Sequence, residues 1–170
     1  MSLQDFSNKA RRLSIQRNIK SYSTLDVIEN KKFDLITMWH SLEHIHDIES
    51  LFDNINRVSH KASYMVIAIP NFNAPEKKFF SKKWAPYDAP RHLYHFKYSD
   101  VKKLLIRYGW SIYDSKSLFQ DTPYNILLSL HDKNFFTYIK ALFILIFSMC
   151  KTFLFGVKYS SSFMVICKKK

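Results

Sequence analysis

Glycine is almost missing from this sequence. Only two of its 170 residues are glycines, Gly109 and Gly156. A phosphate- or dinucleotide-binding loop needs several glycines at fixed spacing, because the backbone must approach the ligand closely. No such glycine-rich loop can form within these residues.

Cysteine is equally scarce. Cys150 and Cys167 both lie among apolar neighbours and show neither the spacing of a metal motif nor a disulfide framework. A reducing compartment is therefore expected. The N-terminus is polar and charged, unlike a secretory signal. We expect a cytoplasmic protein.

Long apolar runs are also lacking. The longest, residues 141–150, is bounded by Lys140 and Lys151 and falls short of the roughly 20 residues that a membrane span needs. The wider apolar segment, residues 138–157, allows three interpretations. It covers the sheet or forms a homodimer contact, which we favour, or it lies in a membrane interface with lysine flanks, or it spans the membrane despite Lys151.

Acidic residues are outnumbered, with 14 Asp and Glu against 26 Lys and Arg, so the formal net charge is +12. A basic protein can bind nucleic acid, anionic lipid or an anionic substrate. No basic stripe with interleaved aromatic residues stands out. A solvated, lysine-rich surface is therefore favoured over nucleic-acid binding.

What the chain does contain is a regular alternation of strand and helix patterns. With 47% hydrophobic residues, 170 residues suffice for one domain with a real core. Strands are expected at residues 19–22, 33–38, 63–69, 110–119 and 162–167, and helices at 8–17, 47–58, 99–108 and 124–130. Residues 1–3 are too short for a strand by themselves. The alternation predicts an α/β fold with a mostly parallel, three-layer sheet.

The strand at residues 33–38 organises this expectation. Polar and aromatic residues follow it directly, beginning with Trp39 and His40, and open α/β sheets bind ligands at such carboxyl ends. The aromatic-rich segment at residues 71–98 has little periodicity. A loop of that length in a compact domain is usually a lid or a binding loop.

Three motifs, in order along the chain, carry a family resemblance. They read F-D-L-I-T-M-W-H-S-L-E-H at residues 33–44, P-N at 70–71, and W-A-P-Y-D-A-P-R-H-L-Y-H-F at 84–96. Together they resemble a class I S-adenosylmethionine-dependent methyltransferase, in particular the bacterial branch with W-H-x-L-E-H and D-x-P-R-H-L motifs. The resemblance covers roughly residues 5–119.

The resemblance also has a gap. The family begins with a strand, a glycine-rich turn and a helix, and this sequence has no counterpart of that segment. We therefore expect an N-terminally truncated, Rossmann-like three-layer sandwich lacking the first βα unit. Residues 1–122 would form the partial methyltransferase domain, and residues 123–170 an apolar helical segment and the last strand of the same domain.

The resemblance implies S-adenosyl-L-methionine as the cofactor and assigns residues to it. Asp5 would hold the ribose hydroxyls, and Thr24, Leu25 and Asp26 would border the adenine. Trp39 and His40 would face both cofactor and substrate. The alternatives are an exposed Asp5 near the terminus, an ordinary turn at residues 24–26, and a Trp39 that belongs to the core.

For substrate handling, the candidates are His92 and His95 with Asp88 and Arg91. Imidazole titrates near neutral pH and can accept the proton of the acceptor, and Arg91 can bind an anionic group with two hydrogen bonds. The alternative is a buried polar network that pins the long loop.

Residues 40–44 also spell H-x-x-E-H, the inverted zinc-protease signature. That chemistry needs both histidines on one helical face, whereas His40 follows a strand directly. We read Glu43 and His44 as a structural hydrogen-bonded pair more readily than a catalytic one, and expect no metal.

The sequence thus predicts methyl transfer to a small-molecule or lipid-linked oxygen or nitrogen acceptor, with the chain incomplete by itself. The alternative is a non-catalytic methyltransferase remnant that associates with a membrane surface or a partner protein.

Overall fold

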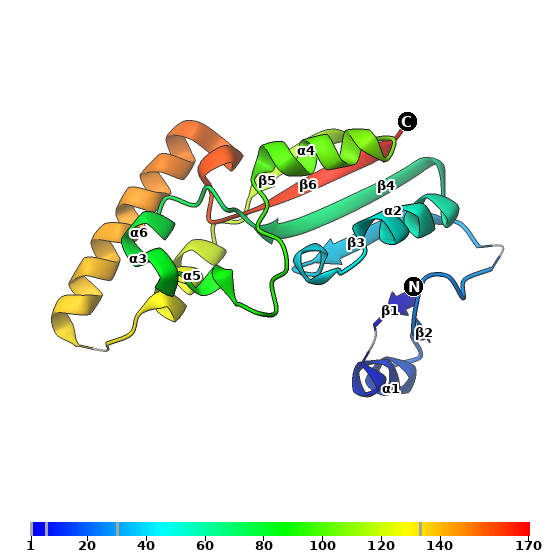
Figure 1. Ribbon diagram of the computed structural model, residues 1–170, viewed down its shortest axis with the longest axis horizontal. Coiled ribbons are helices and arrows are strands. Elements are labelled where there is room, and N and C mark those ends of the chain that lie inside the picture. The colour runs from blue at the N-terminus through cyan, green and yellow to red at the C-terminus, as the bar shows by residue number, and fades with distance from the viewer. Residues whose placement is uncertain (1, 6, 30, 133) are drawn as a thin grey trace.

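A four-stranded sheet runs through the middle of the molecule (Figure 1). The computed structural model describes residues 2–5, 7–29, 31–132 and 134–170; Phe6, in the loop expected before the first helix, lies outside them. The strands are β3 (Phe33–Trp39), β4 (Ser59–Pro70), β5 (Trp110–Ser117) and β6 (Ser162–Lys169). They lie in the order β3-β4-β6-β5.

The expectation of a mostly parallel sheet is wrong. Strands β3 and β4 are parallel, but β6 is antiparallel to both β4 and β5. The reason lies in the connection: β5 ends at Ser117 opposite Phe163, near the start of β6. Residues 118–161 connect the end of β5 to the start of β6 at this same end of the sheet. Strand β6 must therefore run in the direction opposite to β5.

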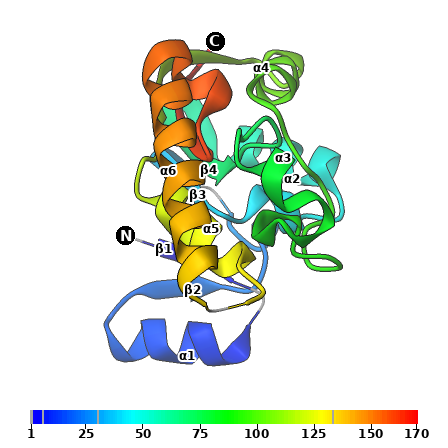
Figure 2. The ribbon, with the colours of Figure 1, turned by 90° about the vertical axis from the view of Figure 1, so that its left-hand side faces the viewer.

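A separate two-stranded sheet lies at the N-terminus. Strand β1 (Ser2–Gln4) pairs in parallel with β2 (Lys20–Tyr22), so the prediction of no strand at the first residues is wrong. Figures 1 and 2 both place this small sheet on the side of β3 away from β4. Within the four-stranded sheet β3 pairs only with β4, and its other edge is open among the described residues.

The helices predicted at residues 8–17, 47–58, 99–108 and 124–130 form, each beginning within three residues of its expected start, whereas α3 forms inside the segment expected to be a loop. The helices are α1 (Asn8–Gln16), α2 (Ile48–Arg57), α3 (Lys77–Phe80), α4 (Tyr98–Arg107), α5 (Asp121–Ser129) and α6 (Phe135–Phe155). The predicted caps Ser7 and Asp47 are confirmed: each side chain accepts a hydrogen bond from the backbone amide three residues on. Asp100 accepts from the Lys97 amide, and α4 begins at Tyr98, one residue before the predicted start.

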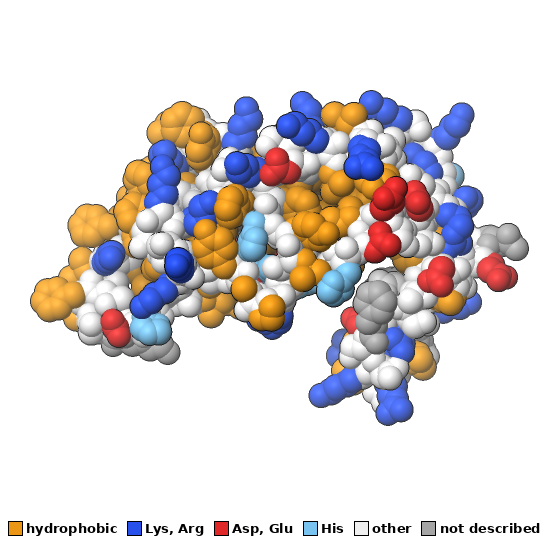
Figure 3. Space-filling model, in the orientation of Figure 1, with side chains coloured by type: hydrophobic (Ala, Val, Ile, Leu, Met, Phe, Trp, Pro, Cys, Tyr) orange, Lys and Arg blue, Asp and Glu red, His pale blue; other side chains and the backbone are white. Residues whose placement is uncertain are grey.

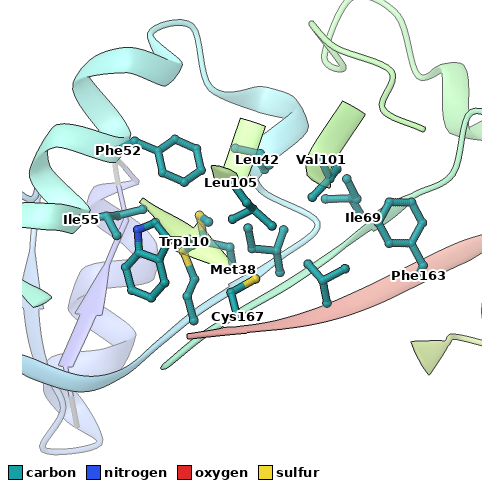
Figure 4. Close-up of a cluster of buried hydrophobic side chains, with 13 residues drawn as sticks. Met38, Leu42, Phe52, Ile55, Ile69, Val101, Leu105, Trp110, Phe163 and Cys167 are labelled. Carbon is teal, nitrogen blue, oxygen red and sulfur yellow. The ribbon is translucent and has the colours of Figure 1, made fainter. Parts of the chain in front are cut away.

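One face of the sheet carries the main core (Figure 4). Phe52 and Ile55 of α2 and Val101 and Leu105 of α4 pack on alternate residues of the central strands, and all four are at most 1% exposed. The strand side chains beneath them are Met65, Ile67, Ile69, Phe163, Val165 and Cys167. Burying such side chains is the main favourable contribution to folding.

The opposite face of the sheet is largely bare in the described part of the chain. Leu35 and Trp39 of β3 are 56% and 55% exposed, and Tyr113 of β5 is 72% exposed. The register pairs Leu35 with Tyr64, whose ring contacts Tyr113 at 6.1 Å, so these side chains share one face. The described core joins the sheet to α2 and α4 alone among the helices, and the expected third layer does not form over these residues.

The P-N motif has a structural role at the end of β4. Asn71 is fully buried, and its side-chain amide donates to the backbone oxygens of Val157, Lys158 and Ser160, at 3.3, 3.2 and 2.8 Å. Its own side-chain oxygen accepts from the Asn73 amide at 3.0 Å. Asn71 therefore joins the end of β4 to the turn that leads from α6 into β6.

Replacing Asn71 by Ala should lower the free energy of unfolding by about 1–3 kcal/mol, because buried carbonyl groups lose their donor. Urea unfolding followed by circular dichroism measures the change. The matched control is Asn73→Ala, at an exposed position, for which we expect a change within about 0.5 kcal/mol. Equal effects of the two substitutions would contradict the role given to Asn71.

Candidate functional site

A cavity of about 580 Å³ opens at the carboxyl ends of β3 and β4. Its walls come from the end of β3, from the loop at residues 85–92 and from α5, and include His40, Pro70, Pro86, Asp88, Arg91, His92, Asp121, Tyr124, Asn125 and Leu128. The position agrees with the sequence-based expectation that ligands bind at this edge. Ionisable groups and apolar side chains thus face one space.

His40 is the charged centre of this cavity. It follows β3 with a backbone φ of 44°, a left-handed conformation that is uncommon for residues other than glycine. Its Nε2 lies 3.4 Å from Asp121 Oδ2 and its Nδ1 lies 3.6 Å from Glu43 Oε1. These are ion-pair contacts, and the carboxylates of Asp121 and Glu43 raise the pKa of His40 to about 9. His40 is therefore an imidazolium at neutral pH.

Glu43 fixes the loop to the strand end. The residue is 1% exposed, and its backbone oxygen accepts hydrogen bonds from the amides of Leu93 and Tyr94, at 2.8 and 3.3 Å. Neither carboxylate oxygen has a hydrogen-bond donor within the described residues. Its Oε1 lies 4.0 Å from His92 Nε2 as well as near His40. His40 therefore supplies a positive charge next to this buried carboxylate.

The hydrogen bond of His92 fixes its tautomer. Nδ1 lies 2.8 Å from the Pro86 carbonyl oxygen, which can only accept, so Nδ1 carries the hydrogen. In the neutral ring Nε2 is then free to accept a proton. That atom lies 3.8 Å from Asp88 Oδ2, and the side chain is only 11% exposed. His92 is therefore oriented as a base at the cavity wall.

Asp88 and Arg91 form the polar rim. Asp88 Oδ1 accepts from Arg91 at 2.7 and 3.1 Å, and this guanidinium lowers the pKa of Asp88. The Arg91 side chain is 75% exposed, so it retains donors for an anionic group. The predicted set of Asp88, Arg91 and His92 is brought together here.

His95 lies beside His92, with the two ring centroids 6.3 Å apart, but is not among the residues that line the cavity. It is exposed, its Nε2 is 3.1 Å from the Tyr87 carbonyl oxygen, and its ring contacts Phe72 and Tyr87. It borders a separate void of about 10 Å³, roughly the room of a single water. His95 does not line the larger cavity.

The residues predicted to bind the cofactor fall into two groups. Trp39 and His40 lie together at the end of β3, as expected. Asp5 lies beside the small sheet, where its side chain accepts from the Ser7 amide and its backbone oxygen from Arg11. Thr24 and Leu25 lie in the segment leading away from β2. The open edge of β3 faces the small sheet (Figures 1 and 2), and none of Asp5, Thr24 and Leu25 lines the cavity.

The H-x-x-E-H motif does not form a helical zinc site. His40 belongs to the end of β3 and His44 to a short 3₁₀ turn, Leu42–His44. Glu43, His44 and His92 do bring ligand atoms within 4.8 Å of one another, but donors around one zinc ion lie about 3.4 Å apart. The positive charge of the His40 imidazolium, next to Glu43, would also repel a metal cation bound there. The expectation of no metal stays a prediction.

Sequence reasoning missed the contribution of α5 to the cavity. Asp121, Tyr124 and Leu128 lie on one side of this helix at helical spacing. The signal was weak, because a short helix after a strand is compatible with many packings.

The charge on His40 predicts a pH dependence of stability. Its folded-state pKa of about 9 is above the ordinary value of about 6.5. The native state therefore binds more protons between these values, and the associated stabilisation is present below pH ~6.5 and lost as pH rises through ~9. Asparagine tolerates the left-handed backbone conformation, so His40→Asn is a suitable variant. We expect its free energy of unfolding to lack the decline that His40 causes in the wild type as pH rises from ~6.5 through ~9. His95→Asn is the control, and identical pH curves for the wild type and His40→Asn would refute the ion-pair assignment.

A family model described as a methyltransferase domain matches residues 4–115, and no curated protein matches the sequence. An S-adenosylmethionine-dependent methyltransferase from Thermotoga maritima has a TM-score of 0.65 at 14% identity, covering 100% of this chain and 73% of that one. One from Mesorhizobium loti has a TM-score of 0.60 at 14% identity, covering 98% and 79%.

Magnesium protoporphyrin IX methyltransferase from Synechocystis, solved with bound S-adenosylhomocysteine (SAH), is also similar. Its TM-score is 0.55 at 12% identity, covering 98% of this chain and 63% of that one. At such identities the structures show a shared Rossmann-like α/β fold. The family model covers more than half of the sequence, and S-adenosylmethionine is the cofactor of the similar enzymes. The chain belongs to the methyltransferase-domain family.

Proposed function

We propose that this protein transfers the methyl group of S-adenosylmethionine to an oxygen or nitrogen atom of a small or lipid-linked acceptor bound in the 580 Å³ cavity. The observation that carries this proposal is the fixed tautomer of His92, a residue that lines a cavity at the carboxyl ends of parallel strands and whose Nε2 carries no hydrogen in the neutral ring. An acceptor with a hydroxyl or ammonium group must lose a proton when it is methylated, and a positioned base accelerates that loss.

The polar rim formed by Asp88 and Arg91 would orient the acceptor in the cavity. Arg91 keeps free donors at the mouth of the cavity, so it would bind an anionic group of the acceptor. Tyr124 and Leu128 form an apolar wall. An acceptor with an anionic group and an apolar portion fits both features.

The described residues fit only part of S-adenosylmethionine. This cofactor supplies an electrophilic methyl group on a sulfonium. Asp5 would bind the ribose, Thr24 and Leu25 the adenine, and Trp39 the region near the sulfonium. The amino-acid end needs a close backbone approach, and the two glycines, Gly109 and Gly156, lie far along the chain from these residues.

We further propose that a strand, a turn and a helix from outside residues 1–170 complete the site. Two features support this. The edge of β3 that faces the small sheet is unpaired among the described residues, and Leu35, Trp39 and Tyr113 are exposed on the bare face beside it. A strand added at this edge would pair with β3, and its helix would cover the bare face.

The same features favour the second candidate, a methyltransferase remnant without catalytic activity. An open edge and an uncovered apolar face are also what a domain would show if it had lost its cofactor-binding segment.

Calorimetric titration with SAH separates the two candidates. The samples are residues 1–170 and the longest product encoded in frame with them. We expect heat of binding only from the longer product. Heat from residues 1–170 alone would overturn the need for a completing unit. If both samples are folded and neither binds, the remnant is the correct assignment.

In whichever of the two samples has methyltransferase activity, His92→Ala should lower kcat by roughly 10²- to 10⁴-fold. The substitution should also remove the acidic limb from the pH profile of kcat. The matched control is His95→Ala, which alters a histidine of the same loop that does not line the cavity, and we expect its pH profile to match the wild type. Unchanged turnover of His92→Ala between about pH 6 and 9, spanning the ordinary pKa of imidazole, would assign the proton acceptor elsewhere.

A further inference from the structure

Helix α6 exposes an apolar face along its whole length. Its outer face, defined here as Phe136, Ile139, Phe143, Ile146, Phe153 and Leu154, recurs at helical spacing. All six are exposed, from 39% for Ile139 to 84% for Phe153. In Figure 3 hydrophobic side chains project along the margin of the molecule where Figure 1 places α6. Patches of this kind mark surfaces that bind a protein or a membrane.

The other side of α6 is fixed to the protein. Ala141, Ile144, Ser148 and Thr152 are buried, and Ala141 and Ile144 pack with Ile126 of α5. Thr152 donates to the Ser148 and Tyr159 backbone oxygens. The position of α6 is therefore set by packing, and its outer face cannot turn inward.

Lysines flank the outer face without interrupting it. Lys140 and Lys151 lie about three turns apart on one flank of α6 between the inner and outer faces. The Lys151 ammonium lies 5.5 Å from the ring of Phe147 and 5.4 Å from that of Tyr159. Figure 3 shows basic side chains among the hydrophobic ones at this end of the molecule. An apolar strip beside lysines is the pattern of a helix lying in a membrane interface.

We propose that the outer face of α6 binds the surface of a membrane that contains anionic lipids. The charge of the protein decides between this occupant and a second copy of the chain. Two copies, each with a formal net charge of +12, repel each other when this face pairs with itself, whereas an anionic leaflet attracts the lysine flank.

A membrane crossing is disfavoured by the inner side of α6. Residues Phe135–Tyr159 are long and apolar enough to cross by length and composition, and 22% of the most apolar part is buried. Crossing would carry Lys140 and the packed α5 contact into hydrocarbon, at a cost of several kcal/mol for the charge. Lying in the interface keeps both where the fold places them.

If the protein has the proposed function, binding of the outer face of α6 to a membrane also selects the methyl acceptor. Helix α5 has Tyr124 and Leu128 at the cavity and Ile126 against the inner side of α6, so α5 lies between the cavity and α6. Docking of the outer face of α6 would hold the cavity near the membrane surface, behind these two helices. The acceptor class is therefore a lipid-linked molecule with an anionic headgroup that reaches Arg91.

Vesicle flotation of the full chain tests the docking. The probes are vesicles of phosphatidylcholine alone and of phosphatidylcholine mixed with phosphatidylglycerol. We expect binding to the mixed vesicles and a decrease in binding as salt rises. Phe143→Gln with Phe153→Gln should lower vesicle affinity roughly tenfold or more per side chain. Lys140→Gln with Lys151→Gln should lower it roughly fivefold per charge, on anionic vesicles only.

The control is Ile106→Gln on α4, an exposed apolar residue of a different surface, which should leave flotation unchanged. Circular dichroism establishes that each variant is folded. Absence of flotation with the folded wild type, or dimers that Phe143→Gln with Phe153→Gln makes monomeric, would overturn the proposal, as would resistance to alkaline extraction, which indicates a span. SAH titration is independent of this result, so docking and cofactor binding can fail separately.

Discussion

The candidate site depends on one buried carboxylate. Glu43 holds the long loop through its backbone oxygen and lies between two histidines through its side chain. Without this carboxylate, His40 would lose one of its two counter-charges, whereas His92 would keep its hydrogen bond to the Pro86 carbonyl oxygen. A buried carboxylate is costly unless it is paired, and here the charged partner is His40, whose pKa the carboxylate helps to raise. The charge of Glu43 and the charge of His40 therefore depend on each other.

The bare sheet face and the open edge of β3 reflect one constraint. A sheet is stable when each face is covered and each edge is paired, covered or charged. Helices α2 and α4 satisfy this on one face. On the other face, Leu35, Trp39 and Tyr113 carry the hydrophobic character of a buried layer while remaining exposed. The sequence of β3 is therefore suited to an interior strand, although β3 occupies a sheet edge.

The elements of the fold were largely predictable from the sequence. Caps such as Ser7 and Asp47 marked helix starts because their side chains satisfy specific backbone amides, and the apolar run of β4 marked a central strand. The direction of β6 was not predictable from its residues, since the alternation of apolar side chains is the same for either direction. Likewise, His92 and His95 look equivalent in sequence, and only the bonds to Pro86 and Tyr87 separate their environments. The wall formed by α5 depends on tertiary packing, which local pattern does not encode.

The unpaired edge of β3 has a consequence for handling the molecule. The amide and carbonyl groups along this edge, unpaired among the described residues, offer a template for an added strand. A short peptide designed to pair with that edge would therefore act as a stabilising cap during purification.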